Sequence, residues 1–196
     1  YRGYDSSGIG VIDLKSSQIV LRKTNGKIAN LQHLIETHPF PPSSIGISHT
    51  RWATHGPPNK INSHPHADGT GNLIVVHNGI IENYEELKAS LQKKGHKFIS
   101  DTDTEVVPHL IEEYYQGDLF QAIRRAIREL KGAFAIGVIS KDHPDVGSFH
   151  KKAKPLSLPL ILLQKELRKE IVLFLLRGSL HGLLLLPPGF QNLQSP

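Results

Sequence analysis

The 196-residue chain contains no cysteine and no methionine, and it has only one tryptophan. Without cysteine there is no disulfide framework, no thiolate metal site and no cysteine nucleophile among these residues. Long apolar runs are also missing: the two most apolar stretches, residues 171–176 and 183–186, fall well short of the roughly 18 residues that suggest a membrane span. The first residues are polar and do not form a secretory pattern. We therefore expect a cytoplasmic protein with no membrane partner.

A surplus of positive charge is absent from most of the chain. The formal net charge is +5, but residues 1–150 carry 16 Lys and Arg against 16 Asp and Glu. Residues 151–196 carry 7 against 2, which accounts for the whole excess. A nucleic-acid-binding surface needs basic residues gathered on the folded body. The charge pattern therefore argues against a nucleic-acid partner.

The two ends of the chain differ from its middle. A dense polar motif at residues 1–8 leads directly into a strand, which is an unusual start for a domain, so we expect the fold to be truncated at its N-terminus. From about Leu158 the chain is rich in leucine, lacks Asp and carries mostly basic charge. We therefore expect residues 1–158 to form an incomplete domain. Residues 159–196 are expected to be a divergent tail, for instance a frame-shifted reading.

The hydrophobic pattern predicts strands grouped with strands and helices inserted between them, which is typical of an α+β fold with stacked sheets. Asn83 and Glu86 have the spacing of a capping box, and Asp118 is expected to cap a later helix. The predicted strands are 9–12, 18–22, 44–48, 73–76, 98–99 and 133–139, and the predicted helices are 27–37, 84–94, 104–116, 119–131 and, less clearly, 164–176.

The stretch HNGIIEN at residues 77–83 is the feature around which the other motifs are arranged. The apolar run at 73–76 leads into Asn78-Gly79, and a helix pattern follows within four residues. A strand, a sharp turn and a helix can place a side-chain amide beside a free backbone N–H, which suits a developing negative charge on oxygen. Asn-Gly is also a strong turn signal, so a plain connection is the alternative interpretation.

Other polar clusters, at residues 2–5, 49–55 and 101–103, also follow or precede predicted strands, and their chemistry is complementary. Arg51 offers a planar guanidinium suited to a carboxylate. Asp103 offers a counter-charge for an ammonium group, although it could instead cap the helix that follows it. Together with oxyanion donors at residues 78 and 79, this set would fit an amino acid with a reacting carbonyl, such as glutamine.

Four motifs carry a family resemblance: YRGYDS at residues 1–6, HTRWATHG at 49–56, VHNGIIEN at 76–83 and DTDTE at 101–105. In this order they closely resemble the N-terminal class II glutamine amidotransferase (glutaminase) domain of the glutamine–fructose-6-phosphate aminotransferase (isomerizing) family. The resemblance implies an N-terminal-nucleophile hydrolase sandwich, in which two antiparallel sheets lie between helical layers.

The resemblance also implies roles for individual residues. Arg51 would bind the α-carboxylate of L-glutamine, and Asp103 would bind its α-amino group. The Asn78 side chain and the Gly79 N–H would form the oxyanion hole.

Four more residues match the family around the pocket. Thr54 and His55 would line it, Trp52 would lie near the route by which ammonia leaves, and Arg2 would lie at the closing edge. In the family an N-terminal cysteine attacks the carboxamide, and its own α-amino group acts as the base. Because this chain has no cysteine, we expect it to lack glutaminase activity.

At the level of the whole protein, the resemblance implies release of ammonia from L-glutamine and its transfer to fructose 6-phosphate, which gives glucosamine 6-phosphate. The sugar would bind in an isomerase half that the resemblance does not reach, no cofactor is implied, and the longer protein is expected to be a homo-oligomer. A non-catalytic glutamine-binding module is the alternative.

Histidines raise a rival hypothesis, a zinc-dependent hydrolase. None of them has the i, i+4 helical spacing of a zinc protease, and no carboxylate is suitably placed among them. The pair in His64-Pro65-His66 is only weakly typical of a metal site, so we expect none here. The histidines concerned are His49, His55, His64, His66 and His77.

Overall fold

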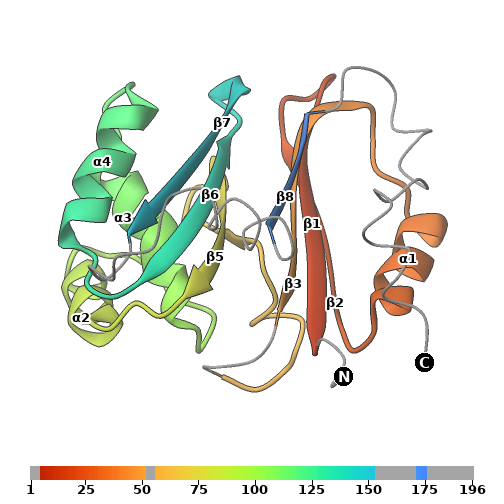
Figure 1. The fold of residues 1–196 in the computed structure, drawn as a ribbon. Helices are drawn as coiled ribbons and strands as arrows, with labels where there is room; N and C mark the ends of the chain where they lie inside the picture. Colours follow the sequence, from red (N-terminus) through yellow and green to blue (C-terminus); the bar gives the residue numbers. More distant parts are fainter. Residues whose placement is uncertain (1–4, 52–55, 153–170, 176–196) are drawn as a thin grey trace, which may run out of the picture.

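Two four-stranded antiparallel sheets stack face to face, with helices on the outer side of each (Figure 1). The computed structural model describes residues 5–51, 56–152 and 171–175. The strand order is β2-β1-β3-β8 in the first sheet and β4-β5-β6-β7 in the second. The predicted architecture of two antiparallel sheets between helical layers is therefore confirmed.

The elements follow the predicted order closely, and most boundaries agree within a few residues. The strands are β1 (Ser6–Asp13), β2 (Ile19–Asn25), β3 (Ser43–Arg51), β4 (His66–Ala67), β5 (Leu73–Gly79), β6 (Phe134–Ser140), β7 (His143–Lys152) and β8 (Ile171–Leu175). The helices are α1 (Ile28–Thr37), α2 (Tyr84–Lys93), the 3-10 turn η1 (Asp103–Glu105), α3 (Val106–Tyr114) and α4 (Leu119–Glu129).

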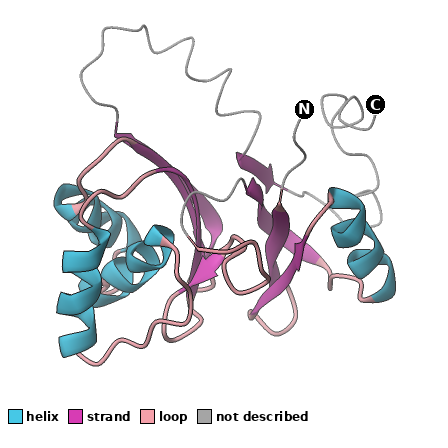
Figure 2. Cartoon of the chain, turned by 90° about the horizontal axis from the view of Figure 1, so that it is seen from below, coloured by secondary structure: helices cyan, strands magenta, loops and turns pink. Residues whose placement is uncertain are grey.

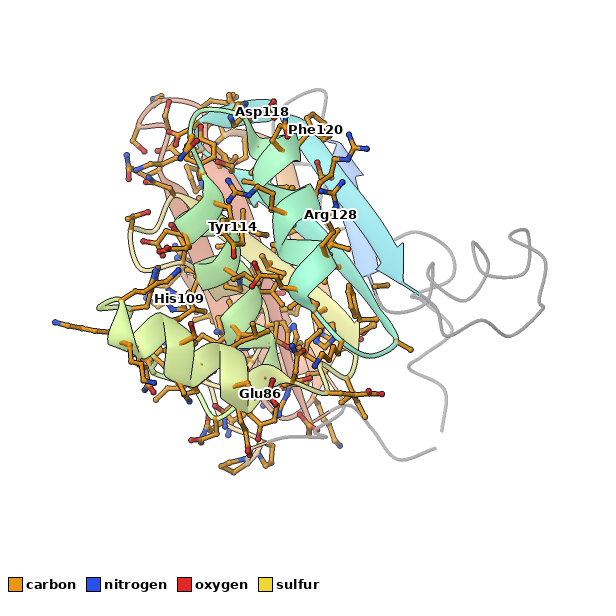
Figure 3. The ribbon with its side chains drawn as sticks, turned by 90° about the vertical axis from the view of Figure 1, so that its left-hand side faces the viewer. Glu86, His109, Tyr114, Asp118, Phe120 and Arg128 are labelled. Carbon is orange, nitrogen blue, oxygen red and sulfur yellow. The ribbon has the colours of Figure 1, made fainter. Side chains whose placement is uncertain are left out.

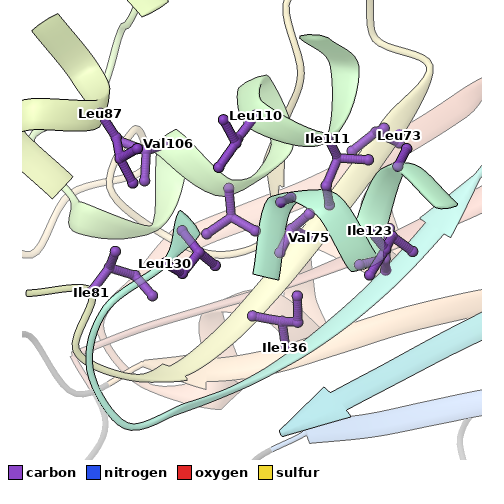
Figure 4. Close-up of a cluster of buried hydrophobic side chains, with 14 of the residues drawn as sticks. Leu73, Val75, Ile81, Leu87, Val106, Leu110, Ile111, Ile123, Leu130 and Ile136 are labelled. Atoms are coloured by element: carbon purple, nitrogen blue, oxygen red, sulfur yellow. The ribbon is translucent and has the colours of Figure 1, made fainter. Parts of the chain in front are cut away.

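β5 is buried on both of its faces, which explains its unbroken apolar sequence. Successive side chains of a strand point to opposite faces. Leu73 and Val75 belong to the core between the second sheet and the helices (Figure 4), whereas Ile74 and Val76 belong to the core between the two sheets. All four side chains are at most 3% exposed. The strand that leads to the Asn-Gly turn is thus fixed from both sides.

Helices α2, α3 and α4 cover the outer face of the second sheet, and α1 lies on the outer side of the first (Figures 1 and 2). In α4 the buried residues are Leu119, Ala122, Ile123 and Ala126, a spacing that forms one apolar stripe. Asp118 caps this helix as predicted, because its side chain accepts a hydrogen bond from the Gln121 N–H at 3.0 Å.

The capping box predicted for α2 does not form. Asn83 is the N-cap residue, but its side chain makes no cap hydrogen bond. Its amide instead donates to the Glu129 carbonyl and accepts from the Lys131 N–H, at 2.9 and 2.8 Å. Asn83 therefore ties the turn after β5 to the end of α4, a long-range contact that sequence spacing could not show.

Three further expectations are corrected. Residues 98–99, predicted as a strand, form no regular element, because Glu105 binds the N–H groups of Ile99 and Ser100 at 2.9 and 2.7 Å. Short β4 and the edge strand β7 were not predicted. Residues 171–175, placed in a possible helix, form β8 and pair with β3. The rest of the predicted tail lies outside the described residues, so the assignment of 159–196 stays a prediction.

Candidate active site

β3 carries two polar side chains on its inner face at the end of the strand. Ile45, Ile47, His49 and Arg51 alternate along it, and each is at most 5% exposed. The two isoleucines, Ile45 and Ile47, belong to the core between the sheets. The same period of two that buries them therefore directs His49 and Arg51 inward as well.

β5 brings Asn78 to the same place from the opposite sheet. Asn78 lies on the face of β5 that carries Ile74 and Val76, which point toward the first sheet. There its Oδ1 lies 2.7 Å from Nε2 of His49. This contact joins the two sheets at the ends of their central strands.

His49 fixes the orientation of the Asn78 amide. Burial lowers the pKa of His49 to about 4, against the opposing effect of its hydrogen bond to Asn78, so the ring is neutral near pH 7. An amide oxygen can only accept, so the ring nitrogen that faces it carries the proton. With Oδ1 held by His49, the Asn78 NH₂ group is left as the donor that can face a ligand.

The N–H of Gly79, the residue after Asn78, points away from the neighbouring strand β6. The Ile80 N–H binds the Ala133 carbonyl. Gly79 and Phe134, which lie opposite each other, are therefore a non-hydrogen-bonded pair. In such a pair the Gly79 N–H is directed away from β6. His77, two residues earlier, follows the same rule, because its N–H binds Nδ1 of His64. The strand pattern thus supplies a second donor next to Asn78.

Gly79 is required at this position by the backbone. Its φ is +116°, a conformation that L residues with side chains rarely adopt. A Cβ there would lie 2.3 Å from the Ala133 carbonyl oxygen. The sharp turn that exposes the N–H group therefore depends on glycine.

Arg51 lies among carboxylates. Its Nη1 is 3.8 Å from Oδ1 of Asp5, and its Nη2 donates to the Gly56 carbonyl at 3.2 Å. Burial lowers the pKa of Arg51, while Asp5 and Asp103 act in the opposite direction. The guanidinium is held in place and remains charged, as a carboxylate-binding group must be.

Asp103 connects its own loop to the turn after β5. It is 3% exposed, and its Oδ2 accepts the N–H of Ile81 at 2.8 Å. The alternative role as a helix cap is not seen: the N-cap of η1 is Thr102, without a side-chain cap bond. Asp103 thus lies beside the turn after β5 and within electrostatic range of Arg51.

The buried histidines form a packed polar cluster behind the site. The rings of His49 and His64 stack at 4.3 Å, and His66 packs edge-on against His64 at 4.9 Å. Hydroxyls of Thr102 and Thr104 contact His66 and His77 at 3.2 and 2.8 Å. Burial lowers the pKa of both His64 and His66 well below the ordinary value. The rings of His64 and His66 are therefore neutral near pH 7, and their hydrogen-bond partners come mainly from the same cluster.

The predicted site residues fall into two groups. Asn78, Gly79, Arg51 and Asp103 meet at the ends of β3 and β5 and at the start of η1. The other four, Arg2, Trp52, Thr54 and His55, lie outside the described residues. Sequence reasoning missed the orienting role of His49 and the pairing of Asp5 with Arg51. The alternation of Ile45, Ile47, His49 and Arg51 along one strand was the available signal for the first of these.

Two solved structures have a similar fold. One is the glutamine phosphoribosylpyrophosphate amidotransferase of B. subtilis, with 27% identity and a TM-score of 0.58 over 71% of this chain and 30% of that one. The other, described as the allosteric regulatory enzyme of purine biosynthesis, has 29% identity and a TM-score of 0.61 over the same shares. The fold is therefore that of an N-terminal-nucleophile amidotransferase domain. The pattern of the glutamine amidotransferase domain family matches residues 49–155, and the chain belongs to that family.

Curated relatives point to one branch of the family. Glutamine–fructose-6-phosphate aminotransferase (isomerizing) of Clostridium perfringens is 48% identical over 160 residues, which are 82% of this chain and 26% of the relative. The protein of the same name from Thermotoga maritima is 46% identical over 156 residues, or 80% of this chain and 25% of the relative. The chain thus spans about a quarter of the length of these relatives.

Proposed function

We propose that this domain is the glutaminase half of an amidotransferase that releases ammonia from L-glutamine. The observation that supports this most directly is the Asn78 amide, oriented by neutral His49 and placed beside the Gly79 N–H. Two preorganised donors in a partly enclosed site stabilise the oxygen of a tetrahedral intermediate. Amide cleavage passes through such an intermediate.

The charged groups nearby favour an amino-acid substrate. In this proposal Arg51 binds the α-carboxylate of glutamine through its planar fork, and Asp103 accepts from the α-ammonium group. Because Asp103 also holds the Ile81 N–H, the position of the ammonium group is linked to that of the oxyanion turn. Trp52, Thr54, His55 and Arg2 keep their proposed places around the pocket.

The nucleophile is not among these 196 residues, since the chain contains no cysteine. In the proposed reaction a cysteine sulfur attacks the carboxamide carbon, ammonia leaves, and water then cleaves the thioester to give glutamate. We therefore propose that the 196-residue chain binds glutamine without hydrolysing it. A non-catalytic glutamine-binding module is the second candidate, and it makes the same binding prediction for this chain.

The names of the relatives extend the proposal to the longer protein. There, the released ammonia would be transferred to fructose 6-phosphate, giving glucosamine 6-phosphate, in a homo-oligomer. A cytoplasmic setting fits a phosphorylated sugar, whose charge does not cross a bilayer readily. We also propose a domain boundary near residue 158, which the end of the family match at residue 155 supports.

Calorimetry with glutamine analogues tests the binding roles. Glutamine should bind the 196-residue chain, whereas 4-aminobutyramide, which lacks the α-carboxylate, and glutaramate, which lacks the α-amino group, should each bind more weakly. In Arg51→Gln the first analogue should bind about as well as glutamine does, because the group it lacks has no partner. In Asp103→Asn the same should hold for the second analogue. Arg128→Gln, on the exposed face of α4, is the control.

The possible outcomes bear on different parts of the proposal. Absence of glutamine binding by a folded chain, or equal loss in Arg128→Gln, would reject the assigned roles. Ammonia release from glutamine by the purified chain would reject the proposal that it is inactive. Ammonia release by the longer protein would favour the amidotransferase over the non-catalytic module.

A further inference from the structure

A cluster of two histidines and one glutamate lies in the outer helical layer. His109 and Glu112 are three residues apart on α3 and share one face of the helix. His96 comes from the loop after α2, where the His96 N–H binds the Leu91 carbonyl at 3.1 Å. Figure 3 shows His109 on α3, beside α2. Nothing in the proposed glutaminase reaction uses these three residues.

The three ligand atoms form a nearly regular triangle. Nδ1 of His96 is 3.2 Å from Nδ1 of His109 and 3.4 Å from Oε2 of Glu112, and the third side, from His109 to Glu112, is 3.2 Å. Tetrahedral zinc with bonds of 2.0–2.1 Å separates neighbouring ligand atoms by about 3.3–3.4 Å. Among the described residues, these three form the group of histidine and carboxylate side chains whose ligand atoms lie close enough together to hold one metal ion.

Carboxylates face the outer ring nitrogens of both histidines. Nε2 of His96 lies 3.2 Å from a carboxylate oxygen of Glu113, and Nε2 of His109 lies 3.9 Å from Oε1 of Glu105. Each carboxylate favours a proton on Nε2, which leaves the Nδ1 lone pairs pointing at each other and at Glu112. A histidine ligand that donates its other N–H to a carboxylate is the usual surrounding of a protein-bound metal.

Three acceptor atoms at these distances repel one another unless a cation or a shared proton lies between them. We propose that His96, His109 and Glu112 bind one Zn²⁺ ion through Nδ1, Nδ1 and Oε2. The fourth position faces solvent, because the side chains of His96 and Glu112 are partly exposed, and a water molecule completes the tetrahedron. This assignment departs from the sequence-based expectation of no metal.

Neighbouring backbone supports the site on its third side. The Gly69 N–H, in the turn between β4 and β5, donates to Oε2 of Glu112 at 2.9 Å. A Cβ at Gly69 would lie 3.2 Å from the same oxygen. A bound zinc ion would therefore join three segments, namely the loop after α2, helix α3 and the turn before β5, and its binding should raise the melting temperature.

The test is zinc and cobalt binding by the full 196-residue chain, stripped with a chelator and dialysed. One equivalent of zinc should remain bound after gel filtration, and Co²⁺ should give the visible absorption of a tetrahedral site. His96→Asn and Glu112→Gln should abolish both. Glu113→Gln, which removes only an outer partner, should weaken zinc binding roughly 10–100-fold.

Matched controls are His33→Asn, an exposed histidine of α1, and Glu86→Gln on α2 (Figure 3), which should bind zinc as the original chain does. Circular dichroism checks that each variant folds. Unchanged zinc uptake in folded His96→Asn and Glu112→Gln would overturn the proposal. So would failure of the original chain to retain zinc after gel filtration, a result that means a shared proton occupies the cluster.

Discussion

At the scale of single residues, the neutral state of His49 is what makes Asn78 a directed donor. A charged His49 ring would be costly, because burial and the nearby His77 and Arg51 all disfavour its protonation. A neutral ring still has one N–H, and the Asn78 oxygen lies 2.7 Å from Nε2 of the ring. In the proposed reaction, the oxyanion donor thus depends on a residue that has no assigned contact with glutamine.

Replacing Asn78 tests the oxyanion role directly. In the longer protein with its cysteine, Asn78→Ala should lower kcat for glutamine hydrolysis by roughly 10²–10³, or about 3–4 kcal/mol, because one of two oxyanion donors is lost. KM should change little, since the donor acts mainly in the transition state. Steady-state ammonia release measures both constants. A loss of less than tenfold would remove Asn78 from this role.

The pH dependence of stability tests the state of His49. Between pH 6.5 and about 4 the unfolded histidine takes up a proton that the folded one does not, so stability is lost as the pH falls. From pH 7.5 to pH 5 this loss amounts to about 2 kcal/mol for His49 alone. His49→Gln keeps a donor near Asn78 and cannot titrate.

The measurement is the free energy of urea unfolding at several pH values in both proteins. His64 and His66 contribute with the same sign in both, so the difference between the two curves isolates His49. The curve of His49→Gln should be flatter above pH 5. Parallel curves would show that folding does not lower the pKa of His49 and would contradict the neutral ring.

Sequence reasoning could predict site residues whose chemistry is visible in a motif, and it missed those that act through a neighbour. Asn78, Gly79, Arg51 and Asp103 could be named because each is a charged or donor group at the end of a predicted strand. The pairing of His49 with Asn78 joins residues 29 positions apart on opposite sheets. Only the packing of one sheet on the other brings them together.

At the scale of elements, the turn after β5 depends on its glycine. Gly79→Ala would place a methyl group 2.3 Å from the Ala133 carbonyl oxygen at a φ of +116°. We expect a loss of about 3 kcal/mol, because the clash adds to the cost of the unusual backbone angle. Chemical denaturation measures this loss.

Gly117→Ala is the matched control, since its φ is +91° and a Cβ there would meet nothing within 4 Å. It should cost about 1 kcal/mol, the backbone term alone. Equal losses in the two variants would show that the contact with Ala133 relaxes freely and that the turn is not held against β6.

Element prediction succeeded where one local pattern decides the structure. The stripe of α4 and its Asp118 cap are examples, because both are set within a few residues of sequence. The α2 capping box failed because Asn83 has better partners at residues 129 and 131. The strand at 98–99 failed because Glu105 takes up its N–H groups; there burial raises the pKa of Glu105, but hydrogen bonds from His109 and from this loop lower it more, to about 2.

At the scale of the whole molecule, the two cores share a strand. Leu73 and Val75 of β5 contribute to the core under the helices, and Ile74 and Val76 contribute to the core between the sheets. Neither core can open without exposing half of the buried side chains of this strand. The described sandwich should therefore unfold as one cooperative unit.

Two matched substitutions test this coupling. Ile123→Val removes one methylene from the core under the helices, and Ile45→Val removes one from the core between the sheets; both side chains are at most 1% exposed. Each should cost about 1 kcal/mol and lower the melting temperature of the same single transition by about 2–4 °C. Differential scanning calorimetry should show one peak that moves as a whole in both variants. A peak that splits, or that moves in one variant only, would mean that the two layers unfold separately, and the site at the ends of β3 and β5 would then be lost before the outer layer melts.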